Sequence, residues 1–369
     1  MRANQFINYC LTEYEDLSQE KENIIKTISG LDASDETQAA LLDRIWKLLN
    51  SETFGSNITN AFVTTTQDEY MQASTLEGHR KNVAEIISRL DSDYGALNGF
   101  LKKLESGGAV NISELAKPVN TFNAVFGGDA VAMKAFDALK GYGVGEKQKG
   151  PGEFALAMMS NKIRLAQGEG DTEIDGIGKV EVKAAMGSKG SGGRLGHGGA
   201  QQDAQAKILM KYKDVIPNTI LKWQANSAGT LSLGVFVDNM DAELPVGGQN
   251  AMGQNNKVRF DIGNELWSPI FGQFGTNIAR TFSTKSGREE TINSYLKNNF
   301  DWYKTKDNFD AYLLISFTFA KTAMGRTGDD LIKMRQSGQL VNDPRISVVP
   351  SKAGAREFFA QISLNNSGV

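Results

Sequence analysis

The chain has 369 residues, a hydrophobic content of 40% and a formal net charge of −3, so it carries enough apolar side chains for a core and its length fits two structural regions. Cys10 is the only cysteine and there are two histidines, which excludes an internal disulfide and leaves carboxylates as the credible metal ligands. The sequence shows no signal peptide and no apolar run long enough to cross a bilayer. We therefore expect a cytoplasmic protein with no membrane partner.

Residues 1–108 predict an acidic helical region. Ser34 is suited to cap a helix, and residues 1–110 hold 10 Lys and Arg against 17 Asp and Glu, so this region should repel DNA. Apolar residues recur at helical spacing and form two stripes, one at Leu41, Leu42, Ile45, Leu48 and Leu49 and one at Val83, Ile86, Ile87, Leu90, Leu97, Leu101 and Leu104. These stripes predict a helical bundle, and the alternative is a helical arm that binds a protein partner or a second copy of the chain.

Residues 109–369 form the second predicted region, separated from the first by the break at Ser106-Gly107-Gly108. A helical stretch over 111–143 leads to a helix over 151–167. The entry to that helix reads Gly-Pro-Gly-Glu, which places a proline and the acidic Glu153 at a helix start, where both are favoured.

The segment from Gly168 to Ala185 predicts a β-hairpin. Residues 171–175 and 179–185 alternate with period two around a loop of Gly176, Ile177 and Gly178. The predicted register sets Glu173 opposite Glu181 and Asp171 opposite Lys183, because a shift by one residue would mix apolar and charged side chains on both faces. One face therefore collects four carboxylates and two lysines.

Such an acidic face is typical of a divalent cation site. Like charges that face each other across a sheet are destabilising unless something positive lies between them, and Mg²⁺ takes one or two protein carboxylates together with phosphate oxygens. Lys183, on the same face as Glu181, can stabilise charge on a phosphate or help to position and deprotonate a water. The alternative is a solvated face with two ordinary ion pairs, Asp171 with Lys183 and Asp175 with Lys179, each worth ~0.2–1 kcal/mol.

An Asp, nine residues, then Glu-x-Lys, preceded by a helix that carries a further Glu, resembles the PD-(D/E)xK nuclease superfamily. The EVKA stretch followed by GGRL is similar to phage-encoded members of that superfamily. The resemblance implies a restriction-endonuclease-like α/β fold, a mixed sheet flanked by helices, over about 60 residues, or 110 if a strand over 311–319 closes the core. Three features depart from the family pattern. Gly170 stands where the family has Pro, and no first core strand is evident between the helix over 151–167 and Asp171. About 90 residues separate the predicted second core helix from the strand over 311–319.

Carried over residue by residue, the resemblance gives each site residue a role. It makes Asp171, Glu181 and the main-chain carbonyl of Val182 the ligands of Mg²⁺, for which Mn²⁺ can substitute. Lys183 becomes the catalytic lysine and Glu153 the accessory carboxylate. Gln205, in a predicted second core helix, would support the site or touch the substrate.

A glycine-rich segment over 187–199 follows the hairpin and contains seven glycines. Glycine lets main-chain N–H groups approach a phosphate, and Lys189 and Arg194 add positive charge. We expect a loop that grips the substrate, and the alternative is a linker. His197 has no ligand-spaced neighbours, which makes it a phosphate contact or a plain loop residue. Residues 147–213 hold 11 Lys and Arg against 7 Asp and Glu, a modest basic segment.

The remaining chain predicts a β-rich insertion at about 225–305, with strands over 230–238 and 257–262. Residues 271–282 fit no single element. The apolar run over 311–319 suits a strand buried on both faces, and a helix over 329–336 follows it. Short strands over 346–349 and 359–364 complete the prediction.

These expectations combine into a Mg²⁺-dependent endonuclease that hydrolyses phosphodiester bonds of DNA, acting in a host cytoplasm if the gene is phage-encoded. The alternative is a phage virion structural or assembly protein that keeps a nuclease-like fold. A third hypothesis is a module that binds DNA without cutting it.

Overall fold

The computed structural model describes residues 34–62, 69–91, 93–144, 149–185, 192–195, 208, 211–212, 214, 230–245, 252–284, 287–341, 345–347 and 360–365. Within this part, residues 34–185 with 309–324 form one compact unit, unit 1, and residues 192–308 with 325–365 form a second, unit 2. The two units therefore separate near residue 190, not at the glycine pair that follows residue 106. No helix among the described residues combines the length and apolar character that spanning a bilayer requires.

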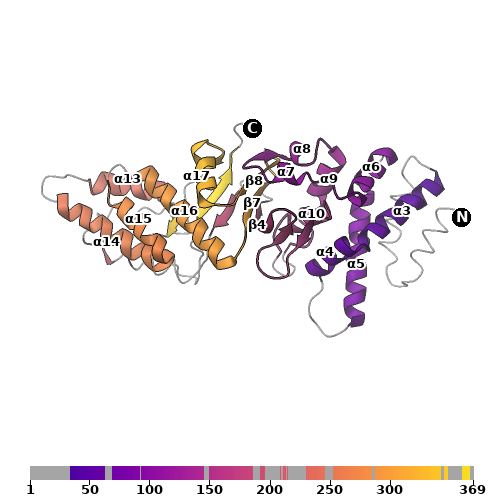
Figure 1. The fold of residues 1–369 in the computed structure, drawn as a ribbon, viewed down its shortest axis with the longest axis horizontal. Coiled ribbons are helices and arrows are strands. Elements are labelled where there is room, and N and C mark those ends of the chain that lie inside the picture. Colours follow the sequence, from indigo (N-terminus) through magenta and orange to yellow (C-terminus); the bar gives the residue numbers. More distant parts are fainter. Residues whose placement is uncertain are drawn as a thin grey trace. The chain divides into compact units, whose positions relative to one another are not determined.

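Unit 1 is a mixed α/β unit built on a six-stranded sheet with the order β1-β8-β7-β4-β3-β2 (Figure 1). β2, β3 and β4 pair antiparallel, β4 and β7 pair parallel, and β8 pairs antiparallel with β1. Helices flank this sheet, which agrees with the predicted fold class. The strands are β1 (Asn120–Thr121), β2 (Ile163–Leu165), β3 (Thr172–Ile174), β4 (Gly178–Ala185), β7 (Ala311–Ser316) and β8 (Lys321–Gly325).

The N-terminal helices of unit 1 confirm the helical prediction and add one break. Ser34 caps α3 by accepting the N–H of Thr37, and the predicted apolar stripe over 41–49 is buried. The second predicted stripe is divided between two helices, because Asp93 accepts the N–H groups of Gly95 and Ala96 and so starts a new helix. The helices are α3 (Asp35–Leu49), α4 (Glu52–Phe62), α5 (Glu69–Ser88) and α6 (Tyr94–Glu105).

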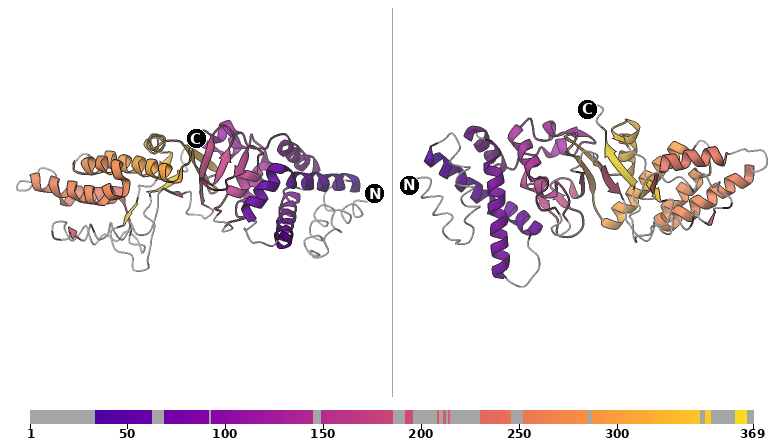
Figure 2. Two further views of the ribbon diagram at one scale, coloured as in Figure 1. Left: turned by 60° about the horizontal axis from the view of Figure 1, so that its bottom comes forward. Right: turned by 180° about the vertical axis from the view of Figure 1, so that it is seen from behind.

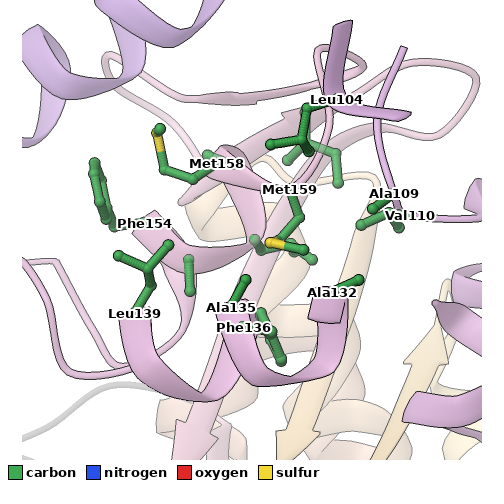
Figure 3. Close-up of a cluster of buried hydrophobic side chains, with 14 of the residues drawn as sticks. Leu104, Ala109, Val110, Ala132, Ala135, Phe136, Leu139, Phe154, Met158 and Met159 are labelled. Atoms are coloured by element: carbon green, nitrogen blue, oxygen red, sulfur yellow. The ribbon is translucent and has the colours of Figure 1, made fainter. Parts of the chain in front are cut away.

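These helices share one hydrophobic core with the sheet and with the helices that follow. Those later helices are α7 (Ile112–Leu115), α8 (Phe122–Val125), α9 (Ala130–Leu139) and α10 (Glu153–Met158). Figure 3 shows where α9 and α10 meet, with Leu139 of α9 beside Phe154 of α10. The N-terminal helical region is therefore part of the same core as the sheet.

α4 covers the outer edge of the sheet through two asparagines. Asn57 is fully buried, donates to the carbonyls of Ala157 and Ile163 at 3.1 and 3.3 Å, and accepts the N–H of Leu165 at 2.9 Å. Asn60 donates to the carbonyl of Leu165 at 3.2 Å. The two asparagine side chains thus form hydrogen bonds with main-chain groups of β2 that would otherwise be free to pair with another strand.

The helix predicted over 151–167 is shorter than expected, and the strand that the sequence did not reveal follows it. α10 ends at Met158, Ser160 stops the helical pattern by accepting the N–H of Lys162 through its hydroxyl, and β2 begins at Ile163. The bonds from Asn57 favour the extended conformation here. They come from a residue more than 100 positions away, so no local pattern could reveal them.

The hairpin forms with a register that differs by two residues from the prediction. Thr172 lies opposite Val180, Glu173 opposite Lys179 and Ile174 opposite Gly178. The expected pairing of Glu173 with Glu181 is therefore wrong. The turn consists of residues 175–177, and the alternation of faces is preserved because the shift is an even number.

Asp310 explains this register. Its carboxylate accepts the N–H of Lys179 at 2.9 Å, and its own N–H donates to the carbonyl of Lys179 at 2.8 Å. Gly178 has a φ of +102°, and a Cβ at this position would come within 2.1 Å of Asp310 Oδ2. The start of β4 is therefore fixed by a residue beside β7.

Unit 2 corrects the prediction of a β-rich insertion, because the described residues between 233 and 307 are mainly helical (Figure 2). The buried residues Leu233, Phe236, Val237 and Met240 recur at helical spacing, a period that short windows over 230–238 do not distinguish from a strand. Only Thr230–Ser232 is a strand there. The helices are α13 (Leu233–Glu243), α14 (Met252–Phe271), α15 (Gly275–Phe282) and α16 (Arg288–Asp307), with a 3-10 turn, η2 (Gly272–Phe274), before α15.

The C-terminal predictions are largely confirmed. The strand predicted over 311–319 is β7, which is buried at all six of its positions but ends at Ser316. The predicted helix over 329–336 is α17 (Gly328–Gln336), which Thr327 and Asp330 begin with a capping box. The short strands of unit 2 are β5 (Gly192–Leu195), β6 (Thr230–Ser232), β9 (Leu340–Val341), β10 (Arg345–Ser347) and β11 (Ala360–Leu364).

Candidate functional site

Asp171 lies directly before β3 and is bonded to β4 through both its main chain and its side chain. Its N–H donates to the carbonyl of Val180 at 3.1 Å, and its Oδ2 accepts the N–H of Val182 at 2.9 Å. The preceding Gly170 has a φ of +72°, a left-handed conformation that glycine adopts at little cost. The chain therefore turns at Gly170 and directs the Asp171 carboxylate to the middle of β4.

The ammonium of Lys183 lies at the centre of the site. Its Nζ donates to Asp171 Oδ2 at 3.4 Å, to the main-chain carbonyl of Val182 at 3.3 Å, and to Glu181 Oε1. Three oxygens that all lie within 3.4 Å of one nitrogen necessarily face a common point. The structure thus brings together Asp171, Glu181, Val182 and Lys183, four of the residues predicted from the sequence.

This arrangement differs from the solvated hairpin face that was the alternative. Glu181 is only 6% exposed, and Lys183 contacts two carboxylates at once. That alternative also predicted an ion pair between Asp175 and Lys179, but both residues pair with other side chains. Asp175 pairs with Arg164 at 2.6 Å, and Lys179 pairs with Glu169 at 2.5 Å.

The charges around Lys183 favour its protonated form. Burial alone would lower the pKa of Lys183, but the carboxylates of Asp171, Glu181 and Glu153 raise it above its usual value. Lys183 is therefore an ammonium at neutral pH in this arrangement. Its chemistry here is that of a hydrogen-bond donor and a positive charge, not that of a base.

Glu153 is a buried carboxyl at the start of α10, with an exposed fraction of 3%. Its Oε1 accepts the N–H of Gly150 at 2.7 Å, and its Oε2 is buried with no hydrogen-bond partner among the described residues. Burial, together with the negative charge of Asp171, raises the pKa of Glu153 to about 7, although the Gly150 N–H and the charges of Lys149 and Lys183 oppose the rise. Glu153 is thus electrostatically part of the same site.

Tyr312 is a site residue that the sequence prediction missed. It lies on β7 directly opposite Glu181 of β4 and is 1% exposed. Burial and the charges of Glu181 and Asp171 raise the pKa of its phenol well above the usual value. The apolar run around Tyr312 predicts a buried strand, but no pattern in the sequence states which residue of β4 it faces.

The site fits a hard divalent cation in its donor chemistry. Asp171 and Glu181 supply two carboxylates and Val182 supplies a carbonyl, which is the share of ligands that Mg²⁺ commonly takes from a protein. The unpartnered Oε2 of Glu153 is a further oxygen of the same kind. Within the described residues, no three His, Cys, Asp or Glu side chains cluster at metal-binding spacing, so a cation here would depend on the carbonyl and on water or phosphate oxygens.

Three of the four residues predicted to bind the substrate have no described position, so the structure does not test them. Lys189, His197 and Gln205 lie outside the described residues, as does most of the predicted second core helix. Arg194 is a residue of β5 in unit 2, where it lies opposite Gln361 of β11.

Comparison with known proteins adds no relative of this chain. No family model, no curated protein and no solved structure matches it.

Proposed function

We propose that the protein is a Mg²⁺-dependent endonuclease that hydrolyses phosphodiester bonds of DNA, with Asp171, Glu181 and Val182 as metal ligands. The observation that carries this proposal is the convergence of these three oxygen donors on the point where the Lys183 ammonium lies. A positive charge already compensates the two carboxylates at this point. The same carboxylates can attract a divalent cation, which would take the place of the ammonium at this point.

The strand order supports a restriction-endonuclease-like core. The resemblance predicts a first strand, an acidic strand, a Glu-x-Lys strand and a closing strand. β2, β3, β4 and β7 lie side by side in this order, with the first three antiparallel and the last pair parallel. In this proposal β2 takes the place of the first core strand, which the sequence did not reveal.

The site residues divide the work of hydrolysis between them. A bound Mg²⁺ would supply a water of lowered pKa and positive charge beside the phosphate. Lys183, protonated in the resting site, donates hydrogen bonds to the phosphate oxygens on which negative charge grows. Asp171 stays in place through its bond from the N–H of Val182, so that this carboxylate needs no reorganisation when substrate arrives.

Glu153 is suited to handle a proton near neutral pH. A carboxyl with a pKa of about 7 exists in both protonation states under these conditions, and its Oε2 has no competing hydrogen bond. In the proposed reaction this oxygen orients the attacking water and accepts its proton.

Plasmid cleavage by the full-length protein tests the proposal. Supercoiled DNA is incubated with Mg²⁺ or Mn²⁺ and wild-type protein, Lys183→Met or Asp171→Asn, and we expect both variants to lose activity by about 10²-fold or more. Lys179→Met is the matched control, because Lys179 lies on the same strand and pairs with Glu169 outside the site. It should cut like wild type.

Failure of the wild type to cut with either cation overturns the enzyme proposal. Retardation of DNA in a gel without cutting would then favour the DNA-binding hypothesis. A discrete oligomer in sedimentation velocity, without either activity, would favour the virion assembly hypothesis.

A further inference from the structure

The segment from Lys149 to Gly152 leads into α10 and is held beside the candidate site at two points. The N–H of Gly150 donates to Glu153 Oε1 at 2.7 Å, and a Cβ at Gly150 would come within 2.5 Å of that oxygen. Gly152 has a φ of +82° and donates its N–H to the carbonyl of Lys140 at 2.9 Å. Lys149 is therefore the residue directly before a glycine that packs against the Glu153 carboxyl.

The ammonium of Lys149 has no partner in the part of the chain that the structure describes. Lys149 is half-buried, and its side chain forms neither an ion pair nor a hydrogen bond with a described residue. Lys183, by contrast, already donates to two carboxylates and a main-chain carbonyl. A half-buried charge without a partner is unfavourable, because it has lost part of its hydration and gains no ionic bond in return. Lys149 is thus suited to a negative group that the described chain does not supply.

The charge of Lys149 acts on the site. Burial and the charge of Asp171 raise the pKa of Glu153, and the charges of two lysines, Lys149 and Lys183, are among the causes that oppose the rise. The attraction between charges weakens with distance and is screened by salt. A cation that acts on the Glu153 carboxyl is therefore also in range of a phosphate held beside that carboxyl.

Resting on the proposed function, we infer that Lys149 binds a phosphate of the DNA backbone at the site. Its ammonium donates to a non-bridging phosphate oxygen and offsets the repulsion between the DNA and the carboxylates of the site. Contacts between an ammonium and a phosphate position the backbone and carry no base specificity. Lys149 therefore contributes equally to the binding of DNA of any sequence.

Fluorescence anisotropy of a labelled DNA duplex tests this role in the full chain. The duplex is titrated with protein at several salt concentrations, with Ca²⁺ in place of Mg²⁺. Lys149→Met should reduce the slope of log K against log salt concentration by about 0.9, as expected for one phosphate contact, and weaken binding roughly five- to tenfold at about 0.1 M salt. Lys149→Arg keeps the charge and should retain the wild-type slope.

Lys162→Met is the matched control. Lys162 is an exposed lysine of unit 1 that follows α10, and its carbonyl accepts the N–H of Asp175 at the hairpin turn. Its charge is not among those that act on Glu153. This variant should leave the slope unchanged. A wild-type slope for Lys149→Met overturns the inference, and so does an equal decrease in both methionine variants, because that result reports net charge and not a contact.

The two proposals fail differently. Wild-type protein that binds no DNA refutes the proposed function and this inference together. Wild-type protein that cuts DNA, combined with a wild-type slope for Lys149→Met, refutes only the role of Lys149. Wild-type protein that binds DNA without cutting it, combined with the reduced slope for Lys149→Met, refutes only the endonuclease and supports the phosphate contact.

Discussion

Asn57 should be a main determinant of the stability of unit 1. It is fully buried on α4 and makes three hydrogen bonds to main-chain groups, the carbonyls of Ala157 and Ile163 and the N–H of Leu165. Asn57→Leu keeps the branched arrangement of side-chain heavy atoms and removes all three hydrogen bonds. A buried polar group that loses its partner costs about 1–3 kcal/mol, and the leucine regains some apolar burial. We expect a net loss of about 3–5 kcal/mol in the free energy of unfolding.

Two further variants separate the hydrogen bonds from general packing. Asn57→Asp keeps an acceptor for Leu165 but places an oxygen against two carbonyls, so its loss should be similar at pH 7 and smaller at low pH, where the protonated acid can donate. Asn60→Leu removes one partly buried bond to the β2 edge, and it should cost less than about 1.5 kcal/mol.

Urea unfolding measures these differences, and hydrogen exchange of peptides that cover β2 assigns them to the sheet edge. The exchange of β2 should accelerate in Asn57→Leu more than in Asn60→Leu. An unfolding free energy of Asn57→Leu within 1 kcal/mol of the wild type, in the range expected of an ordinary surface substitution, would refute the reasoning.

Two other variants test the electrostatics and the turn. Because folding raises the pKa of Glu153 from 4.5 to about 7, the wild type should lose stability between these pH values relative to Glu153→Gln. Thermal unfolding should show equal stability near pH 4.5 and an advantage of up to roughly 3 kcal/mol for Glu153→Gln at pH 8. Parallel curves for Glu153→Gln and wild type would contradict the assignment. Gly178→Ala must displace the Asp310 carboxylate and should cost about 2 kcal/mol or more, whereas Gly176→Ala, with a φ of +77° and open space around it, should cost about 1 kcal/mol. Equal losses by chemical denaturation would refute the clash.

The sequence predicts the parts of the site that lie on one strand. Glu181, Val182 and Lys183 are consecutive, so an alternating pattern is enough to place the Glu and the Lys on one face, and an even shift of register preserves that placement. The long buried strand β7 and the capped helix α17 were also predicted, because burial on both faces and a Thr-x-x-Asp cap are local signals.

The elements that were predicted wrongly depend on distant residues. The main chain of β2 accepts a hydrogen bond from Asn57, and Asp310 sets the register of β4. Tyr312 lies beside the site only because β7 pairs with β4. None of these contacts leaves a trace in the local pattern. The helices of unit 2 were missed for a different reason, since apolar residues such as Leu233 and Phe236 fit either period within a short window.

The parallel pair β4 and β7 has a consequence for synthesis. Lys179 and Asp310, which fix its register, are 131 positions apart, so the ribosome finishes β4 long before the strand that completes it. Closing so long a loop costs conformational entropy that no local contact offsets in advance. Until residue 316 has emerged from the ribosome, β4 of the nascent chain has one edge without a neighbouring strand. A chaperone that shields this edge would prevent it from pairing with a strand of another nascent chain.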